Sequence, residues 1–184
     1  MKLNDLVSAA IFSAVSIGLG FMFMMIPNIE FISVTVFLAG LTLGGIMGAL
    51  VGSTTMLIFS TMNPLGSGLI YFPLLIGQII AMSAVGILGS IMTNLLRISF
   101  PFTKILIGLT GLCGFISSVL YDSITTFVYP ISAGYSWKET IAYAISGLLF
   151  TIVHIVSNIA IFGIVVPQYL KKLRQKEVPN IFLV

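Results

Sequence analysis

Three strongly polar side chains stand in stretches of the sequence that are otherwise apolar. Asp122 is the only acid within a long apolar segment, and His154 and Asn158 are four residues apart, hence on one face of a helix. A polar group in such surroundings is costly unless a neighbouring helix or a ligand satisfies it. These residues are therefore candidates for ligand binding or proton relay, with a hydrogen bond between helices as the alternative.

Further candidates lie towards the predicted outer side, where polar and aromatic residues gather. Asn63 precedes a proline, so it is equally a turn residue, and Asn28 and Glu30 fall in a loop where they could close over a pocket or stay solvated. Gln78 lies about eight residues into its predicted helix, with Tyr71 above it, so that these side chains would line a cavity open to the outside. The full set of candidate substrate-binding residues is Asn28, Glu30, Asn63, Tyr71, Gln78, Tyr121, Asp122, Thr125, Tyr129, His154 and Asn158.

The charge of these candidate residues limits the charge of a suitable ligand. The candidates are uncharged or acidic apart from His154, and Lys138 is the only Lys or Arg in the predicted outer half. A strongly anionic ligand would lack a counter-charge, whereas a neutral or cationic heterocycle suits carboxylates, amides and tyrosine rings. Helix N-termini can also hold an anion, so no substrate is excluded on this ground.

Catalytic motifs are absent from the sequence. It has no HExxH, GxSxG or Walker A pattern and no second histidine, and the single cysteine, Cys113, can form neither an intrachain disulfide nor a thiolate cluster. We expect no enzymatic activity, cofactor or metal. If the protein moves a solute uphill, the energy must come from an ion gradient or from a separate ATPase.

The elements that position these residues must be membrane helices. Hydrophobic residues make up 58% of the chain and charged residues 7%, with a mean hydropathy of +1.18, whereas a soluble domain is roughly 25% charged. The first apolar run is longer than the apolar core of a signal peptide, so we expect no cleaved leader. We predict one all-α membrane domain over residues 1–184 with a short basic cytoplasmic tail from about residue 167.

Apolar runs bounded by Pro, Gly and Asn predict six transmembrane helices. The apolar stretch from Phe31 to Phe59 is too long for one crossing, and Gly44-Gly45 offers a turn within it. Tyr129-Pro130 should end the fifth helix, since proline cannot continue the hydrogen-bond ladder. The predicted helices span about residues 6–26, 32–43, 46–61, 70–95, 105–128 and 140–166.

The distribution of cations predicts the topology. In the six-helix arrangement seven of the eight Lys and Arg residues face the cytoplasm, which places both termini inside. Orientation and lipid headgroups explain these cations better than nucleic acid does. The cytoplasmic cations are Lys2, Arg97, Lys104, Lys171, Lys172, Arg174 and Lys176. At the outer side, the loop from Ser132 to Glu139 and its neighbours carry the aromatic belt Tyr129, Tyr135, Trp137 and Tyr143.

The chain resembles the substrate-binding S components of energy-coupling factor (ECF) vitamin transporters, which are small six-helix membrane proteins. The resemblance rests on the helix count, the length below 200 residues and the small-residue motif Ala10-Ile11-Phe12-Ser13-Ala14 on the first helix. It implies that Ala10 and Ala14 dock on a coupling transmembrane subunit that works with two ATPases. It also implies a pocket near the extracellular side, with Asn28, Glu30, Gln78, Asp122 and His154 in compatible positions.

We therefore expect the substrate-binding subunit of an ECF-type importer in a bacterial cytoplasmic membrane, which captures a small water-soluble vitamin or precursor. Two alternatives stay open. One is a stand-alone ion-coupled transporter that uses Asp122 and His154 for protons, and the other is a membrane scaffold protein without a small ligand. The sequence does not identify the vitamin.

Overall fold

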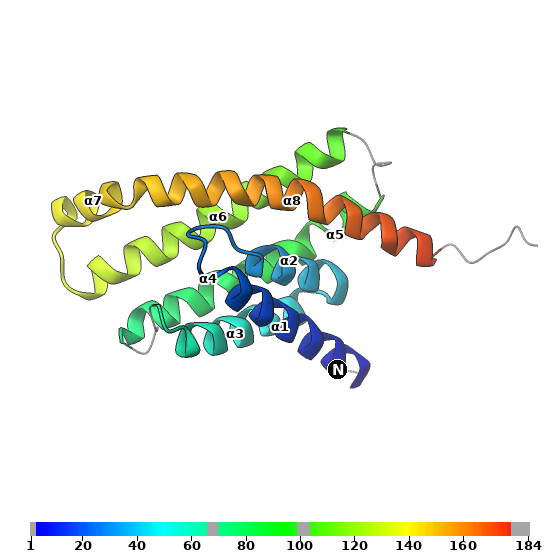
Figure 1. The fold of residues 1–184 in the computed structure, drawn as a ribbon, viewed down its shortest axis with the longest axis horizontal. Helices are drawn as coiled ribbons and strands as arrows, with labels where there is room; N and C mark the ends of the chain where they lie inside the picture. The colour runs from blue at the N-terminus through cyan, green and yellow to red at the C-terminus, as the bar shows by residue number, and fades with distance from the viewer. Residues whose placement is uncertain (1–2, 66–69, 99–103, 178–184) are drawn as a thin grey trace, which may run out of the picture.

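The fold is a bundle of α-helices with no strand among the residues described, which are 3–65, 70–98 and 104–177 of a computed structural model. Figure 1 shows the two longest helices, α6 and α8, side by side along the molecule, with α7 at one end and the N-terminus near the other. The elements are α1 (Leu3–Phe23), α2 (Ile32–Leu43), α3 (Gly45–Met62), α4 (Phe72–Ile91), α5 (Thr93–Ile98), α6 (Lys104–Ser132), α7 (Trp137–Ser146) and α8 (Leu148–Glu177).

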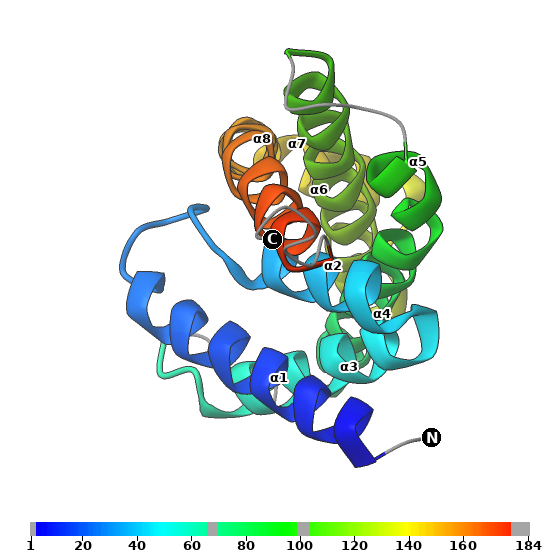
Figure 2. The same cartoon turned by 90° about the vertical axis from the view of Figure 1, so that its right-hand side faces the viewer.

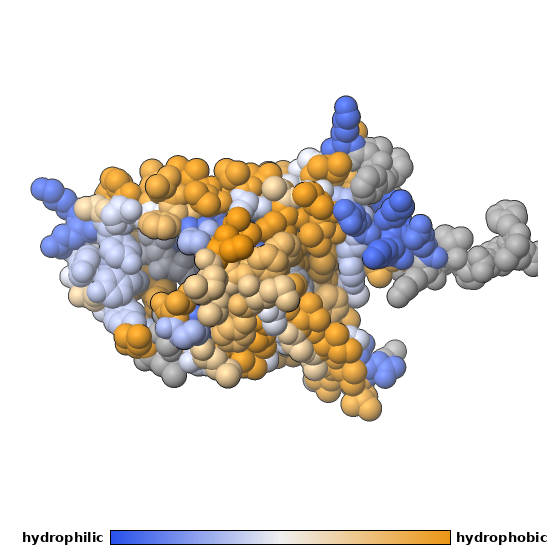
Figure 3. All heavy atoms as spheres, viewed as in Figure 1, coloured by the Kyte–Doolittle hydropathy of each residue, from blue (hydrophilic) through white to orange (hydrophobic). Residues whose placement is uncertain are grey.

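Five of these helices are long and apolar enough to cross a membrane, which makes the chain a multi-pass α-helical membrane protein. They are α1, α3, α4, α6 and α8, whereas α2 has only 12 residues. The surface agrees, because hydrophobic residues form a broad band in Figure 3 and hydrophilic residues gather at the two ends. A belt of this kind suits a hydrocarbon layer flanked by headgroups.

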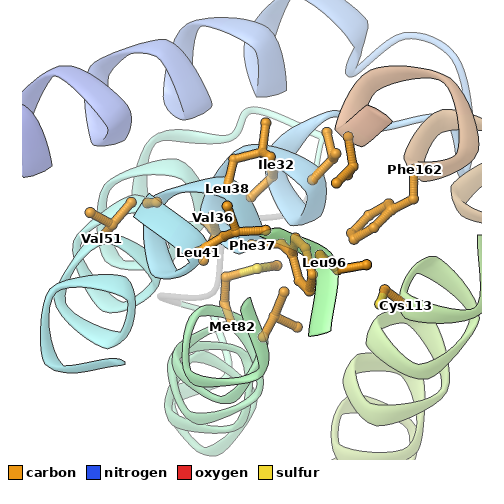
Figure 4. Packing of buried hydrophobic residues seen from close by; sticks show 14 of the residues in the cluster. Ile32, Val36, Phe37, Leu38, Leu41, Val51, Met82, Leu96, Cys113 and Phe162 are labelled. Carbon is orange, nitrogen blue, oxygen red and sulfur yellow. The ribbon is translucent and has the colours of Figure 1, made fainter. Parts of the chain in front are cut away.

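The short helix α2 forms the centre of the bundle. It contacts α1, α3, α4, α6 and α8, as the end-on view in Figure 2 illustrates, and ten of its residues are buried. Phe37 on α2 meets Phe162 on α8 edge to face, with ring centroids 5.2 Å apart (Figure 4). With only 12 residues, α2 lies inside the bundle, surrounded by the longer helices.

Glycines allow α2, α3 and α4 to approach each other closely. A Cβ on Gly40 would overlap the carbonyl oxygen of Gly86, and a Cβ on Gly86 would overlap that of Gly48. The turn predicted at Gly44 is confirmed: α2 and α3 meet there, at a φ of 93° that strongly favours glycine. Predicted helix 32–43 coincides with α2, and 46–61 differs from α3 by one residue at each end.

The other predicted helix boundaries need correction. The first helix begins at Leu3 and ends at Phe23, three residues before residue 26, where a turn leads into Pro27. The predicted helix 70–95 is α4 followed by α5, with Met92 between them. The hydroxyl of Thr93 lies 3.2 Å from the carbonyl oxygens of Gly89 and Leu41, so a side chain competes for backbone acceptors near this break.

Two prolines do not end helices as predicted. The fifth helix runs past Pro130 to Ser132, because a proline in the last turn forfeits a single backbone bond. The final helix runs through Pro167, since Val166 and Leu170 are buried on either side of it and hold the chain to the core. Residues 167–177 are therefore helical rather than a tail, and residues 178–184 lie outside the described part.

The predicted helix 140–166 is two helices, α7 and α8, which meet at Gly147. The predicted outer loop to Glu139 is also shorter, because Ser136 caps α7 and Glu139 bonds back to Ser136, forming a capping box. Trp137, Lys138 and Glu139 therefore belong to α7. The chain between α6 and α7 is reduced to residues 133–136.

Candidate functional site

A cavity of about 330 Å³ lies where the segment between α1 and α2, residues 24–31, passes α6 and α8. Its wall combines ionisable, amide and apolar side chains, a mixture typical of small-molecule sites. The lining residues are Gly20, Phe23, Met24, Ile26, Pro27, Asn28, Ile29, Glu30, Ile32, Ser33, Met56, Phe59, Asn63, Met82, Tyr121, Asp122 and His154.

At one side of this cavity, His154 lies between two carboxylates from different elements. Its Nδ1 is 2.8 Å from Oδ1 of Asp122 on α6, and its Nε2 is 3.5 Å from Oε1 of Glu30 in the 24–31 segment. The side chains are 8% exposed for His154, 16% for Asp122 and 23% for Glu30. We call these three residues the acid–histidine cluster. Because carboxylates only accept, Nδ1 carries a proton and donates to Asp122.

Asn158, one turn further along α8, lies within hydrogen-bonding distance of two members of the cluster. Its amide nitrogen lies 3.2 Å from Oε1 of Glu30, 2.9 Å from Oγ of Ser118 and 2.8 Å from Nε2 of His154. When His154 is neutral, its Nε2 accepts a hydrogen bond from the amide of Asn158. When His154 is protonated, Nε2–H donates to the carboxylate of Glu30. Asn158 is fully buried, so it contributes to the position of the ionisable groups without lining the cavity.

Hydrogen bonds hold the 24–31 segment to α8 and to the first turn of α2. Ser157 donates to the backbone oxygen of Asn28 at 2.6 Å, and Asn28 has a left-handed φ of 59°, which Asn tolerates. Glu30 accepts from the backbone N–H of Ser33 in the first turn of α2, where the helix dipole favours an anion. Burial raises the pKa of the Glu30 carboxyl, but the bonds from His154 and Ser33 outweigh it and hold this pKa below its usual value.

Most of the residues predicted from the sequence come together here. Asn28, Glu30, Asn63, Tyr121, Asp122 and His154 line the cavity, and Asn158 bonds to two of them. Gln78 does not line it but lies beside the phenol of Tyr121, and its amide oxygen is buried without a partner. The segment after α1 and helices α3, α6 and α8 thus supply one site.

Three predicted residues lie elsewhere. Tyr71 and Tyr129 pack edge to face with ring centroids 5.0 Å apart, and the Tyr71 hydroxyl is 2.7 Å from Oγ of Ser132. With Tyr135 and Tyr143, which pack on Tyr129, they form what we call the tyrosine cluster at the α6–α7 end. The hydroxyl of Thr125 bonds back to the carbonyl of Tyr121 on its own helix. None of these residues lines the cavity.

The sequence reasoning missed several residues of the site. Ser118 stands four residues before Asp122 on α6, so helical spacing could have placed it on the same face. Ser33 could have been recognised as a first-turn N–H facing Glu30. Met24, Met56 and Met82 carry no such signal, because the sequence does not distinguish a methionine in a cavity wall from one in the core.

Asp122 also lines a second, smaller cavity of about 160 Å³ between α6, α7 and α8. Ser123, Thr126 and Thr151 contribute hydroxyl groups to its wall. Within the described residues, no group of three or more His, Cys, Asp and Glu side chains is arranged to hold a metal ion. The arrangement can bind a small polar molecule or pass protons among carboxylates and imidazole.

Comparison of the chain with protein-family models, with curated proteins and with solved structures found no match.

Proposed function

We propose that the protein is the substrate-binding subunit of an ECF-type importer in a bacterial cytoplasmic membrane, which captures a small water-soluble vitamin or vitamin precursor from outside. The observation that carries the proposal is the 330 Å³ cavity, where two carboxylates, an imidazole and two amides meet inside an apolar bundle. Its volume lies near the lower end of the range for small-molecule sites, about 300–1,000 Å³. A packing role alone would not require this unfilled space.

The exposed face of α1 supports the docking part of the proposal. Ala10 and Ala14 are exposed and line a groove of about 420 Å³ between α1 and α3. Gly18, one turn further, is also exposed, and a Cβ there would meet nothing within 4 Å. Small residues let a partner helix approach closely within a membrane. In this proposal, the coupling transmembrane subunit packs here and the two ATPases bind that subunit.

The first experiment identifies the ligand. The protein is purified in detergent, and any small molecule that co-purifies is released and identified by mass spectrometry, with Asp122→Asn as the control. A stoichiometric water-soluble molecule that the variant lacks supports the proposal. An empty protein that binds no member of a vitamin panel contradicts it.

Docking is tested separately with substitutions on α1. Ala10→Trp and Ala14→Trp should each abolish co-purification with co-expressed coupling subunits, because a bulky side chain fills the groove. Ligand binding by the isolated protein should be retained. Loss of both properties would instead show that the two alanines act in packing.

A second candidate is a stand-alone proton-coupled transporter, and the contacts from Asp122 through His154 to Glu30 favour it. Such a chain of titratable groups can relay protons within a membrane. Uptake by proteoliposomes that contain only this protein, driven by a pH gradient without ATP, would support this candidate over the importer subunit. The scaffold alternative predicts a featureless, tightly packed outer face, and the cavity beside the 24–31 segment does not favour it.

A further inference from the structure

The charge of the cavity is unbalanced, and this narrows the class of ligand. Among its lining residues, Glu30 and Asp122 are acidic, His154 is the only potential cation, and there is no Lys or Arg. The acid–histidine cluster carries a net charge of about −1 with His154 protonated and about −2 with it neutral. Either protonation state of the imidazole therefore leaves an excess of negative charge.

The hydrogen bonds of the cluster do not remove this excess. The two Glu30 oxygens accept from Ser33 and Asn158, and Oδ1 of Asp122 accepts from His154. Oδ2 of Asp122 is buried and has no hydrogen-bond partner. An uncompensated charge away from water is costly, and a carboxylate oxygen without a donor adds to the cost. A positively charged group in the cavity would offset the excess negative charge.

The rest of the wall suits the body of an organic cation. Phe23, Phe59 and Tyr121 present aromatic rings, and three methionines supply polarisable thioethers. Cations lie favourably over aromatic faces, and methionine adapts to irregular apolar or aromatic surfaces. An inorganic cation would leave this apolar part of the wall without a contact. A molecule that joins a cationic nitrogen to an apolar or aromatic frame would use both parts.

We propose that the cavity binds a small organic cation, either a protonated amine or a cationic nitrogen heterocycle, with its charged nitrogen facing Glu30 and Asp122 and its apolar frame against the methionine and aromatic wall. This inference rests on the proposed function, because it names the class of the substrate captured at that site. A neutral ligand would leave the negative charge uncompensated. An anionic ligand would face two carboxylates with at most one cationic group to offset them.

The test sorts candidate ligands by their charge. A polar small-molecule extract of bacterial cells is separated by ion exchange into cationic, neutral and anionic fractions, each supplemented with vitamins of that charge: thiamine, riboflavin, and biotin with pantothenate. Each fraction is incubated with the protein in lipid nanodiscs. Retained molecules are identified by mass spectrometry, and their affinities are then measured with the pure compounds.

Retention of a molecule from the cationic fraction alone is the expected result. Retention of a neutral or anionic molecule instead overturns this inference but leaves the proposed function standing. Retention from no fraction overturns the proposed function and this inference with it. The failures of the two proposals are thus distinguishable.

Two isosteric variants test whether the carboxylates of the cavity bind the cation. Glu30→Gln and Asp122→Asn should each lower the affinity for the retained cation about tenfold or more, because each removes one negative charge facing it. Glu139→Gln is the matched control, since Glu139 is an exposed carboxylate outside the cavity and glutamine also serves in its capping box. Size-exclusion chromatography verifies folding, and either variant suffices if the other does not fold. Unchanged affinity in a folded variant overturns the inference.

Discussion

Glycines bring helices together in both halves of the bundle, since a Cβ on Gly114 of α6 would overlap the backbone oxygen of Asn158 on α8, but the side chains around these contacts differ. Around Gly40, Gly48 and Gly86, the helices α2, α3 and α4 touch backbone to backbone, with no side chain between them. Around His154, the helices α6 and α8 and the 24–31 segment are joined through ionisable side chains that border a cavity. The first half has no room for a ligand at its contacts, and the second half holds the polar groups that could bind one.

From this contrast we expect the first half to contribute mainly to stability and the second half mainly to binding. Close packing in a membrane stabilises by dispersion, since lipid is as apolar as the helices. Buried charge stabilises little and can cost folding free energy, which agrees with the proposal that the charged cluster serves binding. Substitutions in the glycine-packed half should therefore affect folding, and substitutions around the cavity should affect binding more than folding.

The largest effect should come from the glycine-packed half. We expect Gly86→Ala to destabilise the fold by about 3 kcal/mol, because its Cβ would overlap the Gly48 carbonyl and neither backbone can move freely. Thermal unfolding of the purified protein measures this loss. Gly108→Ala on α6 is the control, since a Cβ at Gly108 meets nothing within 4 Å. If both variants are equally stable, the close contacts of α2, α3 and α4 do not contribute to stability as we expect.

In the polar half, Asn158→Leu should cost about 2 kcal/mol of folding free energy and abolish ligand binding. The variant keeps the approximate volume but leaves Glu30 and His154 without their shared partner. Asn94→Leu, at an exposed position on α5, is the matched control and should change neither property. Unfolding and ligand retention are measured on the same preparation. If Asn158→Leu unfolds the protein as severely as Gly86→Ala, the polar half is structural too.

A smaller effect is expected from loss of the hydrogen bond that joins the 24–31 segment to α8. Ser157→Ala removes the donor to the Asn28 carbonyl and should cost about 1 kcal/mol, with faster hydrogen exchange confined to this segment. Ser146→Ala, which removes a bond to the carbonyl of Tyr143 in its own helix, should leave that exchange rate unchanged. An unchanged rate in Ser157→Ala would show that the Asn28 contact does not hold the segment.

The smallest effect is expected in the tyrosine cluster. Tyr71→Phe keeps the ring contact with Tyr129 and removes only an exposed hydrogen bond, so we expect a loss of about 0.5 kcal/mol or less and unchanged ligand affinity. Tyr121→Leu, which removes an aromatic ring from the cavity wall, should lower the affinity. If Tyr71→Phe weakens binding as much as Tyr121→Leu does, the site extends into the tyrosine cluster.

The sequence was most informative where one local signal governs the backbone. The turn at Gly44 was predictable because an apolar run too long for one helix contained two adjacent glycines. The ends at Pro130 and Pro167 were predicted wrongly, because a local rule about proline gave way to packing by residues such as Leu170, whose burial only the fold reveals. The six-span arrangement stays a prediction, since α2 is shorter than an ordinary crossing.

The site was predictable to the extent that polar residues in apolar segments are rare. Asp122, His154 and Glu30 were predicted because each stands out against apolar neighbours, and all three line the cavity. That His154 bridges the other two was not predictable, since it depends on how α8, α6 and the 24–31 segment are placed in space. Tyr71 and Tyr129, which were predicted with them, lie outside the cavity wall, since a polar tip on an outer segment does not show which way the ring points.

The lengths of the helices also bear on the lipid around the protein. At about 1.5 Å per residue, α3 is about 27 Å long and α8 about 45 Å, whereas a typical hydrocarbon layer is about 30 Å thick. The bilayer must therefore thin beside α3, or the residues that flank α3 must lie within the hydrocarbon layer. The longer α8 can tilt or extend beyond the hydrocarbon layer. The α1–α3 groove lies beside the short helix α3, so, under the proposed docking, acyl-chain length should alter how readily the coupling subunit replaces lipid there.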